Sequence, residues 1–438
     1  MTAPRWRGTL PRERERLSAA EALARVLAAV APLAPERVDL SDALGRVLAA
    51  SVVSPLTLPP WDASAMDGYA VRAADVGDAS PESPAALVVD GTVAAGHDDP
   101  RPLAAGTARR IMTGAPLPPG ADAVVRVEDT DGGGDAVLVR RAVAPRRDVR
   151  PRGEDVGVGD VVLEAGAALG PAQIGMLAAC GVGAVGARRR PRVGVLGSGD
   201  ELVPLERAAE AVAGRRVVAS NNHALAAAVR EAGGIPVDLG VAADTVASVR
   251  ERLTSGLGCD LVVTTAGVSA GEFDCMHDAV ADTGGRAERW SVRMRPGAPM
   301  GFGRVGGAAS DPVLGGVPWV GLSGNPGAAL VAFELFVRPA VRRMTGHTLL
   351  YRRRVLVQLE ESVVLAAPVL HLLRVALTWG GAVARARLAG AQGAGRLTTA
   401  ARTDALLVVP EGRTRCDVGD LLEAIPLGET AYGAEPPV

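Results

Sequence analysis

Hydrophobic residues change their spacing along the chain, and each change predicts a different structure. Apolar residues recur at helical spacing over 17–30, where Ser18 and Glu21 form a candidate capping box at the helix start. A second short helix is expected over 41–50. From 71 to 143, short apolar runs alternate with glycine, proline and aspartate, which is typical of a small β domain.

Three segments near this β domain have other patterns. The stretch 54–70 is rich in proline and acids, but its aromatic and methionine residues favour an ordered loop. Residues 171–180 have helical periodicity. The glycines over 181–186 match GxGxxG, but a helix is expected before them and an arginine run follows. A dinucleotide-binding loop requires a strand before it and a helix after it, so we reject that site here.

Apolar runs and helical periods alternate from 192 to 343, and this predicts an α/β domain with a mostly parallel sheet covered on both faces. The run 261–264 is short, β-branched and uninterrupted, as in a strand buried on both faces. The other expected strands are 193–196, 237–241 and 317–322. The expected helices are 222–232, capped by Ser220, then 245–253 and 328–343, with Pro326 in the first turn of the last.

Three of these expected strands end in loops of small residues. They read GSGDE at 197–201, AGVSAG at 266–271 and SGNP at 323–326. Because ligands of parallel sheets bind outside the carboxyl ends of the strands, we expect the loops to lie together at one edge. Helix N-terminal amides there favour a phosphate-bearing ligand, although any one loop alone could be an ordinary turn.

The pattern divides the chain into four domains. We place a helical linker domain at 15–54 and 145–188, and a small β domain at 55–144. The α/β domain is expected at 189–346. Short apolar runs between glycine turns predict a C-terminal β domain, a small barrel or sandwich, at 352–427. The fold class is therefore multidomain α/β plus β.

Composition narrows the range of partners. The 438 residues are 48% hydrophobic but only 3% aromatic, so aliphatic side chains must fill the cores. The net charge of −2 gives no reason to expect nucleic acid, and no apolar run is long enough for a membrane span. Four scattered cysteines argue against structural zinc and for a reducing compartment. With no apolar leader at the N-terminus, we expect a cytoplasmic protein.

Eight motifs, each weak alone, occur in one order along the chain. They read LPPWDASAMDGYAVR, IMTGAPLPPGADAVVRVED, RPRGEDV, GSGDELV, SNN, AGVSAGEFD, RPGAP and SGNPGAA. In order and spacing they resemble the molybdopterin molybdenumtransferase family, which includes MoeA and the E domain of gephyrin. The resemblance covers about residues 15–427, so the α/β domain would bind molybdopterin.

The resemblance implies a reaction and an assembly. Molybdate would be inserted into adenylylated molybdopterin, with release of AMP in a step that needs a divalent cation, Mg²⁺. The protein would be a homodimer whose site lies between the α/β domain of one subunit and the N-terminal domains of the other. Two alternatives stay open. One is a scaffold that binds molybdopterin or a protein partner without efficient metal insertion; the other is an unrelated nucleotide-dependent α/β enzyme, against which the lack of a phosphate-binding lysine motif counts.

The resemblance also implies site residues, taken motif by motif. The implied catalytic acids are Asp67, Asp155, Glu201, Asp244 and Asp274, of which Asp244 and Asp274 would hold the metal. The implied substrate-binding residues are Thr113, Gly114, Ser198, Gly199, Asp200, Gly267, Ser269, Arg295, Pro296, Gly324, Asn325, Pro326 and Arg374. For each acid, a surface or capping carboxylate is the alternative interpretation.

The chain departs from the family pattern where the resemblance implies molybdate contacts. Arg295 stands for the first lysine of the family motif KPGKP, and Ala298 stands for the second. Ala394 replaces a serine, whereas Arg374 retains the family arginine. Further replacements are Ala266 for a glycine, Ser323 for a proline and His277 for a lysine. An oxyanion site lacking two such contacts is expected to bind its anion more weakly.

Overall fold

A computed structural model of the protein describes residues 15–267, 275–307, 315–380 and 383–428. The chain forms two compact units, one from residues 37–187 and the other from residues 1–36 and 188–438. Within the described ranges, no helix is both long enough and apolar enough to cross a membrane.

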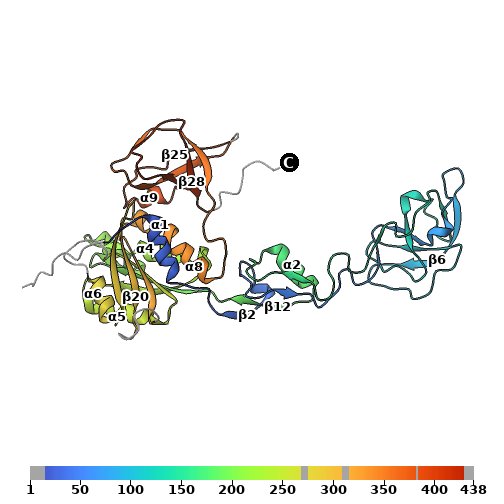
Figure 1. Ribbon diagram of the computed structural model, residues 1–438, viewed down its shortest axis with the longest axis horizontal. Coiled ribbons are helices and arrows are strands. Elements are labelled where there is room, and N and C mark those ends of the chain that lie inside the picture. Colours follow the sequence, from blue (N-terminus) through green and yellow to red (C-terminus); the bar gives the residue numbers. More distant parts are fainter. Residues whose placement is uncertain (1–14, 268–274, 308–314, 381–382, 429–438) are drawn as a thin grey trace, which may run out of the picture. The chain divides into compact units, whose positions relative to one another are not determined.

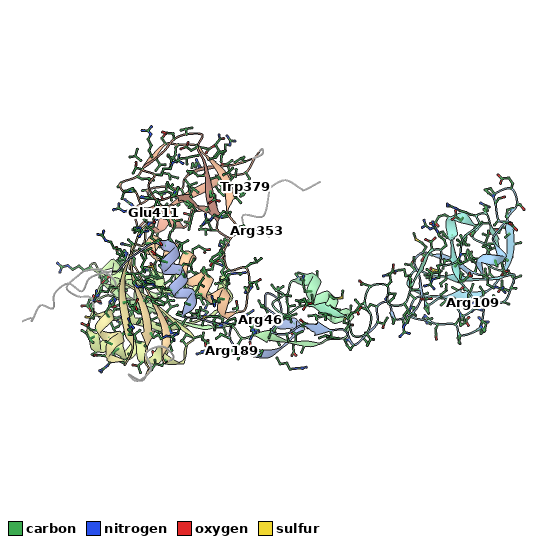
Figure 2. The ribbon with its side chains drawn as sticks, viewed as in Figure 1. Arg46, Arg109, Arg189, Arg353, Trp379 and Glu411 are labelled. Atoms are coloured by element: carbon green, nitrogen blue, oxygen red, sulfur yellow. The ribbon has the colours of Figure 1, made fainter. Side chains whose placement is uncertain are left out.

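The unit of residues 37–187 contains the expected small β domain. Its sheet has the strand order β8-β5-β7-β6-β9. The strands are β5 (Gly68–Val71), β6 (Ala85–Val93), β7 (Thr107–Ile111), β8 (Ala123–Arg126) and β9 (Ala136–Val139). Strands β6 to β9 lie within the segment 71–143 that was predicted to form this domain. Arg109 is buried in this sheet, where it pairs with Asp90 at 2.7 Å (Figure 2).

The rest of this unit is built from short pairs of strands and one helix. The pairs are β3 (Val52–Val53) with β11 (Val161–Leu163), β4 (Ala63–Ser64) with β10 (Val149–Arg150), and β2 (Pro35–Asp39) with β12 (Ala184–Arg188). Helix α2 (Pro171–Ala179) precedes the GxGxxG match, and the match runs into strand β12 rather than into a helix, so the strand–loop–helix order of a dinucleotide loop is not present at these residues.

The prediction of a helix over residues 41–50 is wrong. A single turn of 3₁₀-helix, Leu40–Asp42, is followed by extended backbone in which Val47 and Leu48 bridge to other strands. Gly45 has φ +72°, a left-handed conformation that interrupts any helix through this segment. The buried Val47 and Leu48 therefore face the core from extended chain rather than from a helix.

The second unit holds the α/β sheet, with strand order β1-β18-β20-β21-β17-β13-β16. Strands β21, β17, β13 and β16 are parallel, as predicted, whereas β20 is antiparallel to both neighbours. Strands β18 and β20 were not predicted, because charged residues and glycines interrupt their apolar pattern. The strands are β1 (Glu15–Leu17), β13 (Arg192–Ser198), β16 (Ile235–Ala242), β17 (Leu261–Thr265), β18 (Arg286–Val292), β20 (Pro299–Val305) and β21 (Val317–Leu322).

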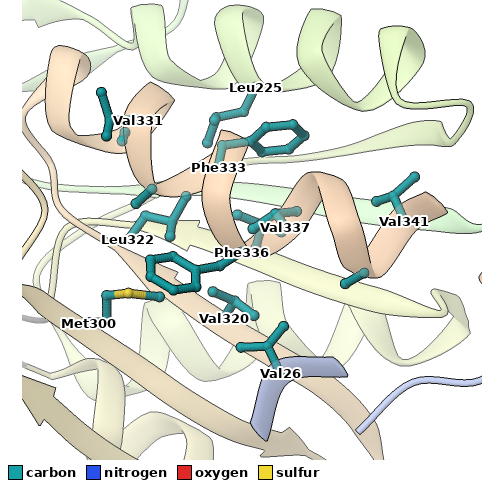
Figure 3. Packing of buried hydrophobic residues seen from close by; sticks show 14 of the residues in the cluster. Val26, Leu225, Met300, Val320, Leu322, Val331, Phe333, Phe336, Val337 and Val341 are labelled. Atoms are coloured by element: carbon teal, nitrogen blue, oxygen red, sulfur yellow. The ribbon is translucent and has the colours of Figure 1, made fainter. Parts of the chain in front are cut away.

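Helices cover both faces of this sheet, as the sequence predicts (Figure 1). On one face, Phe333 and Phe336 pack with Leu225, Met300 and Val320 (Figure 3). The helices on that face are α1 (Ala19–Ala28), α4 (Ser220–Glu231), α7 (Pro326–Ala332) and α8 (Arg338–Met344), with a π-helical turn, η6 (Phe333–Val337), before α8. The other face carries α5 (Val246–Ser255) and α6 (Met276–Asp282).

The predicted helix starts have mixed outcomes. The capping box of Ser18 and Glu21 is confirmed, and Pro326 occupies the first turn of α7. Ser220 does not cap α4, because the helix already begins at this residue and Ala219 takes the cap position without a side-chain bond. Instead, Thr245 caps α5 by accepting a hydrogen bond from the backbone N–H of Ser248.

The C-terminal part of this unit is a closed barrel, which confirms the expected small β domain. Its strand order is β19-β24-β25-β22-β28-β26, and β24 also pairs with β26. The strands are β19 (Met294–Arg295), β22 (Val355–Leu359), β24 (Leu370–Thr378), β25 (Ala384–Leu388), β26 (Ala405–Val409) and β28 (Leu421–Pro426). Because β19 comes from the α/β segment of the chain, it carries the RPGAP motif to the barrel.

Shorter elements complete the two units. They are the 3₁₀ turns η2 (Ala73–Asp75), η3 (Val127–Asp129), η4 (Leu205–Arg207) and η5 (Gly256–Gly258), the helices α3 (Ala208–Val212) and α9 (Leu397–Ala400), and the strands β14 (Leu202–Val203), β15 (Val217–Val218), β23 (Val363–Val364) and β27 (Arg415–Cys416).

Candidate functional site

The three small-residue loops leave the sheet from one edge, as predicted. In the parallel register, Gly197 lies beside Thr265, and Thr265 lies beside Leu322. The GSGDE, AGVSAG and SGNP loops therefore start from neighbouring strand ends. Gly267 has φ +69°, and Ala266 before it has φ +73°, although it bears a side chain. Ser269 and Asp274, two of the implied site residues, lie outside the described residues.

The end of β13 is joined to the end of the neighbouring strand β16 by hydrogen bonds that run in both directions between Asp200 and Asp244. Asp244 accepts a hydrogen bond from the Ser198 hydroxyl at 3.1 Å and another from the Asp200 backbone N–H at 3.3 Å. Asp200 in turn accepts from the Asp244 N–H at 3.1 Å. A Cβ on Gly199 would lie 2.5 Å from a Glu201 carboxylate oxygen, so glycine allows Glu201 to fold back over it. The structure thus brings these implied site residues together.

The SGNP loop is fixed by polar contacts at the start of α7. The Ser323 hydroxyl accepts from the Asn325 N–H at 3.3 Å, and the Asn221 side chain donates to the Gly324 carbonyl at 2.8 Å. Asn221 belongs to the SNN motif at the start of α4. The contact therefore joins two motifs that lie about a hundred residues apart in sequence.

A cavity of about 580 Å³ lies where β19 meets the barrel, and we call it the Arg295 cavity. It brings together Arg295, Pro296 and Asn325 with Ala298 and Ala394, the two positions that depart from the family pattern. Apolar residues form most of its remaining wall. Its lining is residues 294–299, 323, 325, 328, 363–366, 371–373, 388, 392 and 394.

Arg374, the arginine that the chain retains from the family pattern, lies outside the Arg295 cavity. It does not line the Arg295 cavity but a separate cavity of about 140 Å³ that also contains Gly327 and Glu334. Its side chain is 1% exposed, and its guanidinium donates to the carbonyls of Gly393 at 3.0 Å and Arg396 at 3.4 Å. Within β24, His371 and Arg374 are three residues apart, so these two side chains point to opposite sides of the strand.

The charge of Arg374 has no counterion within the described part of the chain. Its Nε has no hydrogen-bond partner there, and burial lowers the pKa of the guanidinium. The other arginines of the small cavity are paired: Arg338 and Arg352 each contact both Glu231 and Glu334. A buried cation without an anion is costly, so Arg374 is suited to a nearby negative ligand.

Asp67 and Thr113 come together in the other unit. Asp67 accepts from the Thr113 backbone N–H at 2.7 Å and from its hydroxyl at 2.8 Å. These bonds, the backbone one first, lower the pKa of the Asp67 carboxyl. Gly114 follows with φ +83°, and its N–H donates to the Ser64 carbonyl. The AMDGY and TGAP motifs are therefore parts of one exposed surface site.

Asp155 belongs to a different part of that unit. Its N–H donates to the Leu58 carbonyl at 3.0 Å, and its side chain lines a cavity of about 450 Å³ with Asp160 and Met176. Among the described residues, no hydrogen bond or ion pair joins it to Asp67 or Thr113.

The described residues contain no group of three or more acids, histidines or cysteines that could hold a metal ion. Of the two implied metal ligands, Asp244 is described and Asp274 is not. The four cysteines, all in described segments, are free thiols. His277, which replaces a family lysine, is a core residue: its ring packs edge-on against Trp319, and its Nε2 donates to the Glu288 carbonyl.

Sequence reasoning missed His371. This residue is 6% exposed on β24 and lines the Arg295 cavity. A single histidine in an apolar strand carries no motif. Its position beside Arg295 depends on the pairing of β19 with β24, which joins segments about 75 residues apart in the sequence.

Comparisons with known proteins identify the family of the chain. Three family models match in order: the MoeA N-terminal region (domain I and II) over residues 17–181, a probable molybdopterin binding domain over 194–343, and the MoeA C-terminal region (domain IV) over 357–427. The chain belongs to the MoeA family. The resemblance of the eight motifs is thereby confirmed.

Individual MoeA relatives cover most of the chain. The Mycobacterium tuberculosis protein named molybdopterin molybdenumtransferase 2 is 42% identical over 305 residues, 67% of this chain and 71% of the relative. Molybdopterin molybdenumtransferase 1 of the same organism is 34% identical over 93% of this chain and 98% of its own length. The crystal structure of a MoeA protein from Pyrococcus horikoshii, 28% identical, covers 94% of this chain and all of that chain with a TM-score of 0.78.

Proposed function

We propose that this protein is a molybdopterin molybdenumtransferase, which inserts molybdate into adenylylated molybdopterin and releases AMP. Membership of the MoeA family and relatives of that name at up to 42% identity support this activity. The observation that carries the proposal is the pair of cations at β19 and β24. Arg295 lines the larger cavity, and Arg374 is buried in the separate small cavity, without a counterion in the described residues.

The two arginines suit a dianionic oxyanion. Arg295 is exposed at the cavity wall, and none of the ion pairs of the described residues occupies it. Gly327 and the Ala394 carbonyl lie next to the Arg374 guanidinium, and Ala394 also lines the Arg295 cavity. Molybdate in this cavity would thus lie near Arg295, and the segment at Ala394 borders both the cavity and Arg374. In a site of low polarity, such charge contacts are stronger than in water.

The strand-end loops are the proposed site for the pterin and nucleotide. Ser198, Gly199, Asp200, Gly267, Gly324, Asn325 and Pro326, together with Ser269, would line it. Glycine backbone and helix starts can accommodate phosphate groups. Mg²⁺, held by Asp244 and Asp274, would neutralise the phosphoanhydride. The described residues by themselves do not form that metal site.

The proposal includes a homodimer in the cytoplasm. Asp67, Thr113, Gly114 and Asp155 belong to the unit of residues 37–187, and the other implied site residues belong to the second unit. In the dimer, Asp67 of one subunit would complete the site of the other. The free state of all four cysteines, each in a described segment, fits a reducing compartment.

A scaffold role without metal insertion is the second candidate. Ala298 and Ala394, which both line the Arg295 cavity, are the observations that favour it. The names of the relatives do not favour it, and two cations remain at β19 and β24.

One assay tests the proposal. Purified protein is mixed with adenylylated molybdopterin and Mg²⁺, and AMP is followed with and without molybdate. Release that requires molybdate is the expected result. Tight pterin binding without release would favour the scaffold.

A further inference from the structure

His371 is the second ionisable residue of the Arg295 cavity. Among the described lining residues, it and Arg295 are the ones that carry or can gain a charge. His371 is 6% exposed, so most of its ring is enclosed by protein. In most buried histidines, both ring nitrogens take part in hydrogen bonds. In His371, the structure shows a hydrogen bond at Nε2 alone among the described residues.

The hydrogen bonds of His371 define its tautomer. Its Nε2 lies 2.9 Å from the Ala367 carbonyl oxygen. A carbonyl can only accept, so Nε2 carries a proton. In the neutral ring, Nδ1 is then unprotonated. Within the described residues, no group bonds Nδ1, and Nδ1 is not among the buried atoms that lack a partner. The nitrogen is therefore accessible from the cavity.

The sheet register places His371 next to Arg295. The two residues are direct partners across the parallel strands β19 and β24. Neighbouring strands lie about 4.8 Å apart, and paired residues point to the same face. Both side chains line the same cavity, so one small anion can contact both.

We propose that His371 is an oxyanion-binding residue of this cavity. When protonated, it donates a hydrogen bond from Nδ1 to an oxygen of molybdate, while Arg295 supplies the permanent charge. The inference rests on the proposed function, since it takes molybdate as the ligand. It assigns to His371 part of the binding that Ala298 and Ala394 cannot supply. Protonation of His371 and binding of the anion are then linked: the ring takes one proton from solvent as molybdate binds.

The charges around His371 determine the direction of this linkage. A dianion bound between His371 and Arg295 of β19 favours the protonated ring. Residues 405–409 of β26 and 363–366 at the cavity wall carry no ionisable side chain. Near the end of β26, Glu411 (labelled in Figure 2) pairs with Arg293 at 3.2 Å. Arg374 lies on the opposite side of β24. Molybdate should therefore bind more tightly when the pH is lowered from about 8 to about 6.

Calorimetric titration of the full-length protein with molybdate, at constant ionic strength across this range, tests the proposal. Uptake of one proton tightens binding by up to about tenfold per pH unit. The wild type should show this slope. The His371→Gln variant keeps an amide N–H for the Ala367 carbonyl but lacks Nδ1. It should bind with no slope and with the weak affinity of the wild type at high pH.

His347→Gln is the matched control. His347 lies in the same unit but does not line the cavity, and burial lowers its pKa to about 4, so it is neutral throughout the titration. This variant should keep the wild-type slope. His371→Asn offers an N–H at the Nδ1 position at every pH, so it should bind molybdate tightly, with an affinity that does not change with pH. This variant replaces His371→Gln in the test if the glutamine variant does not fold.

The proposal is overturned if wild-type affinity is flat with pH, if molybdate does not bind at all, or if the His371 variants keep the slope. AMP release is measured in parallel, so the two proposals can fail separately. Molybdate-dependent release with an unchanged slope in His371→Gln would reject the role of His371 alone. If the pH dependence of molybdate affinity is present in the wild type and lost in His371→Gln, but the wild type releases no AMP, only the transferase activity is rejected.

Discussion

Gly327 and Arg374 touch at the start of α7: a Cβ on Gly327 would lie 2.5 Å from a guanidinium nitrogen of Arg374. The same Cβ would lie 2.8 Å from the Ala394 carbonyl oxygen. The absence of a side chain at Gly327 therefore lets a buried cation pack against the helix. This contact connects the SGNPGAA motif, the barrel strand β24 and the Ala394 loop.

Gly327→Ala should displace Arg374 or the Ala394 loop. Overpacking of this kind costs about 1–3 kcal/mol of the free energy of unfolding. The molybdate concentration that gives half-maximal AMP release should rise as well. Denaturant unfolding and the AMP assay measure the two effects. Gly258→Ala, where no atom lies within 4 Å of the new Cβ, is the control. Equal effects from both substitutions would argue against the contact.

Arg374→Met should separate stability from function. The apolar side chain removes the cost of burying an unpaired cation, so the melting temperature should stay the same or rise. Molybdate-dependent AMP release should fall sharply. Arg352→Met is the contrast, because Arg352 pairs with Glu231 and Glu334, and its loss leaves these acids uncompensated and lowers the melting temperature. A marked loss of stability in Arg374→Met would mean that Arg374 has a structural role.

Thr113→Val should shift the acid limb of the pH–rate profile. Thr113 lowers the pKa of Asp67, so the carboxylate persists to a lower pH than usual and is lost as the pH falls through that lowered value. Valine keeps the hydrogen bond from the backbone N–H of residue 113 to Asp67 but removes the one from the hydroxyl. The pKa should rise toward its ordinary value, and activity should decline at a higher pH. A carboxyl NMR titration of Asp67 gives the same quantity directly.

Thr107→Val is the control for that profile, because its hydroxyl donates to the Ala104 carbonyl in the same unit. An acid limb that moves equally in both variants would exclude the Asp67–Thr113 bond as the cause.

Ala298→Lys with Ala394→Ser should restore molybdate contacts in the Arg295 cavity, since both positions line it. A charge-assisted hydrogen bond contributes about 1.5–3 kcal/mol and a neutral one about 1, together roughly two to three orders of magnitude in affinity. Less molybdate should then be needed for AMP release, at unchanged pterin-nucleotide affinity. If the wild type already saturates at micromolar molybdate and the double variant does not differ, other groups have replaced the lost contacts.

Mixing subunits tests the proposed dimer. Asp67→Ala and Asp274→Ala proteins should each be inactive. After subunit exchange, a mixed dimer has one site that lacks both acids and one intact site, so activity should partly return. Exchange is verified by mass spectrometry of differently tagged subunits. Verified exchange without any recovery would show that each site is built from one subunit.

The sequence predicted the parts of the fold that local pattern determines. The buried runs around Val195 and Val263 identified the parallel strands, and the small residues after them located the loops of the sheet edge. Gly45 shows the limit, because apolar spacing over 41–50 predicted a helix that one left-handed residue prevents. The polar strands β18 and β20 depend on pairing with neighbours rather than on their own pattern.

The motifs list implied site residues, but they do not determine which of these residues lie close together. Asp67 with Thr113, and Ser198 with Asp244, were expected from the motifs and do come together. Arg374, which the resemblance implies as a substrate-binding residue, lines the second cavity and not the Arg295 cavity. Motifs give residue types in order along the chain, whereas these placements depend on how β19 joins the barrel.

The most direct test of the transferase activity is the stoichiometry of a single turnover. Protein in excess over adenylylated molybdopterin is given molybdate and Mg²⁺. AMP is quantified by chromatography, and molybdenum in the pterin product by mass spectrometry. The account predicts one molybdenum retained for each AMP released, and neither product without molybdate. AMP released at full yield without molybdenum in the pterin, or bound pterin nucleotide that stays intact, would contradict it.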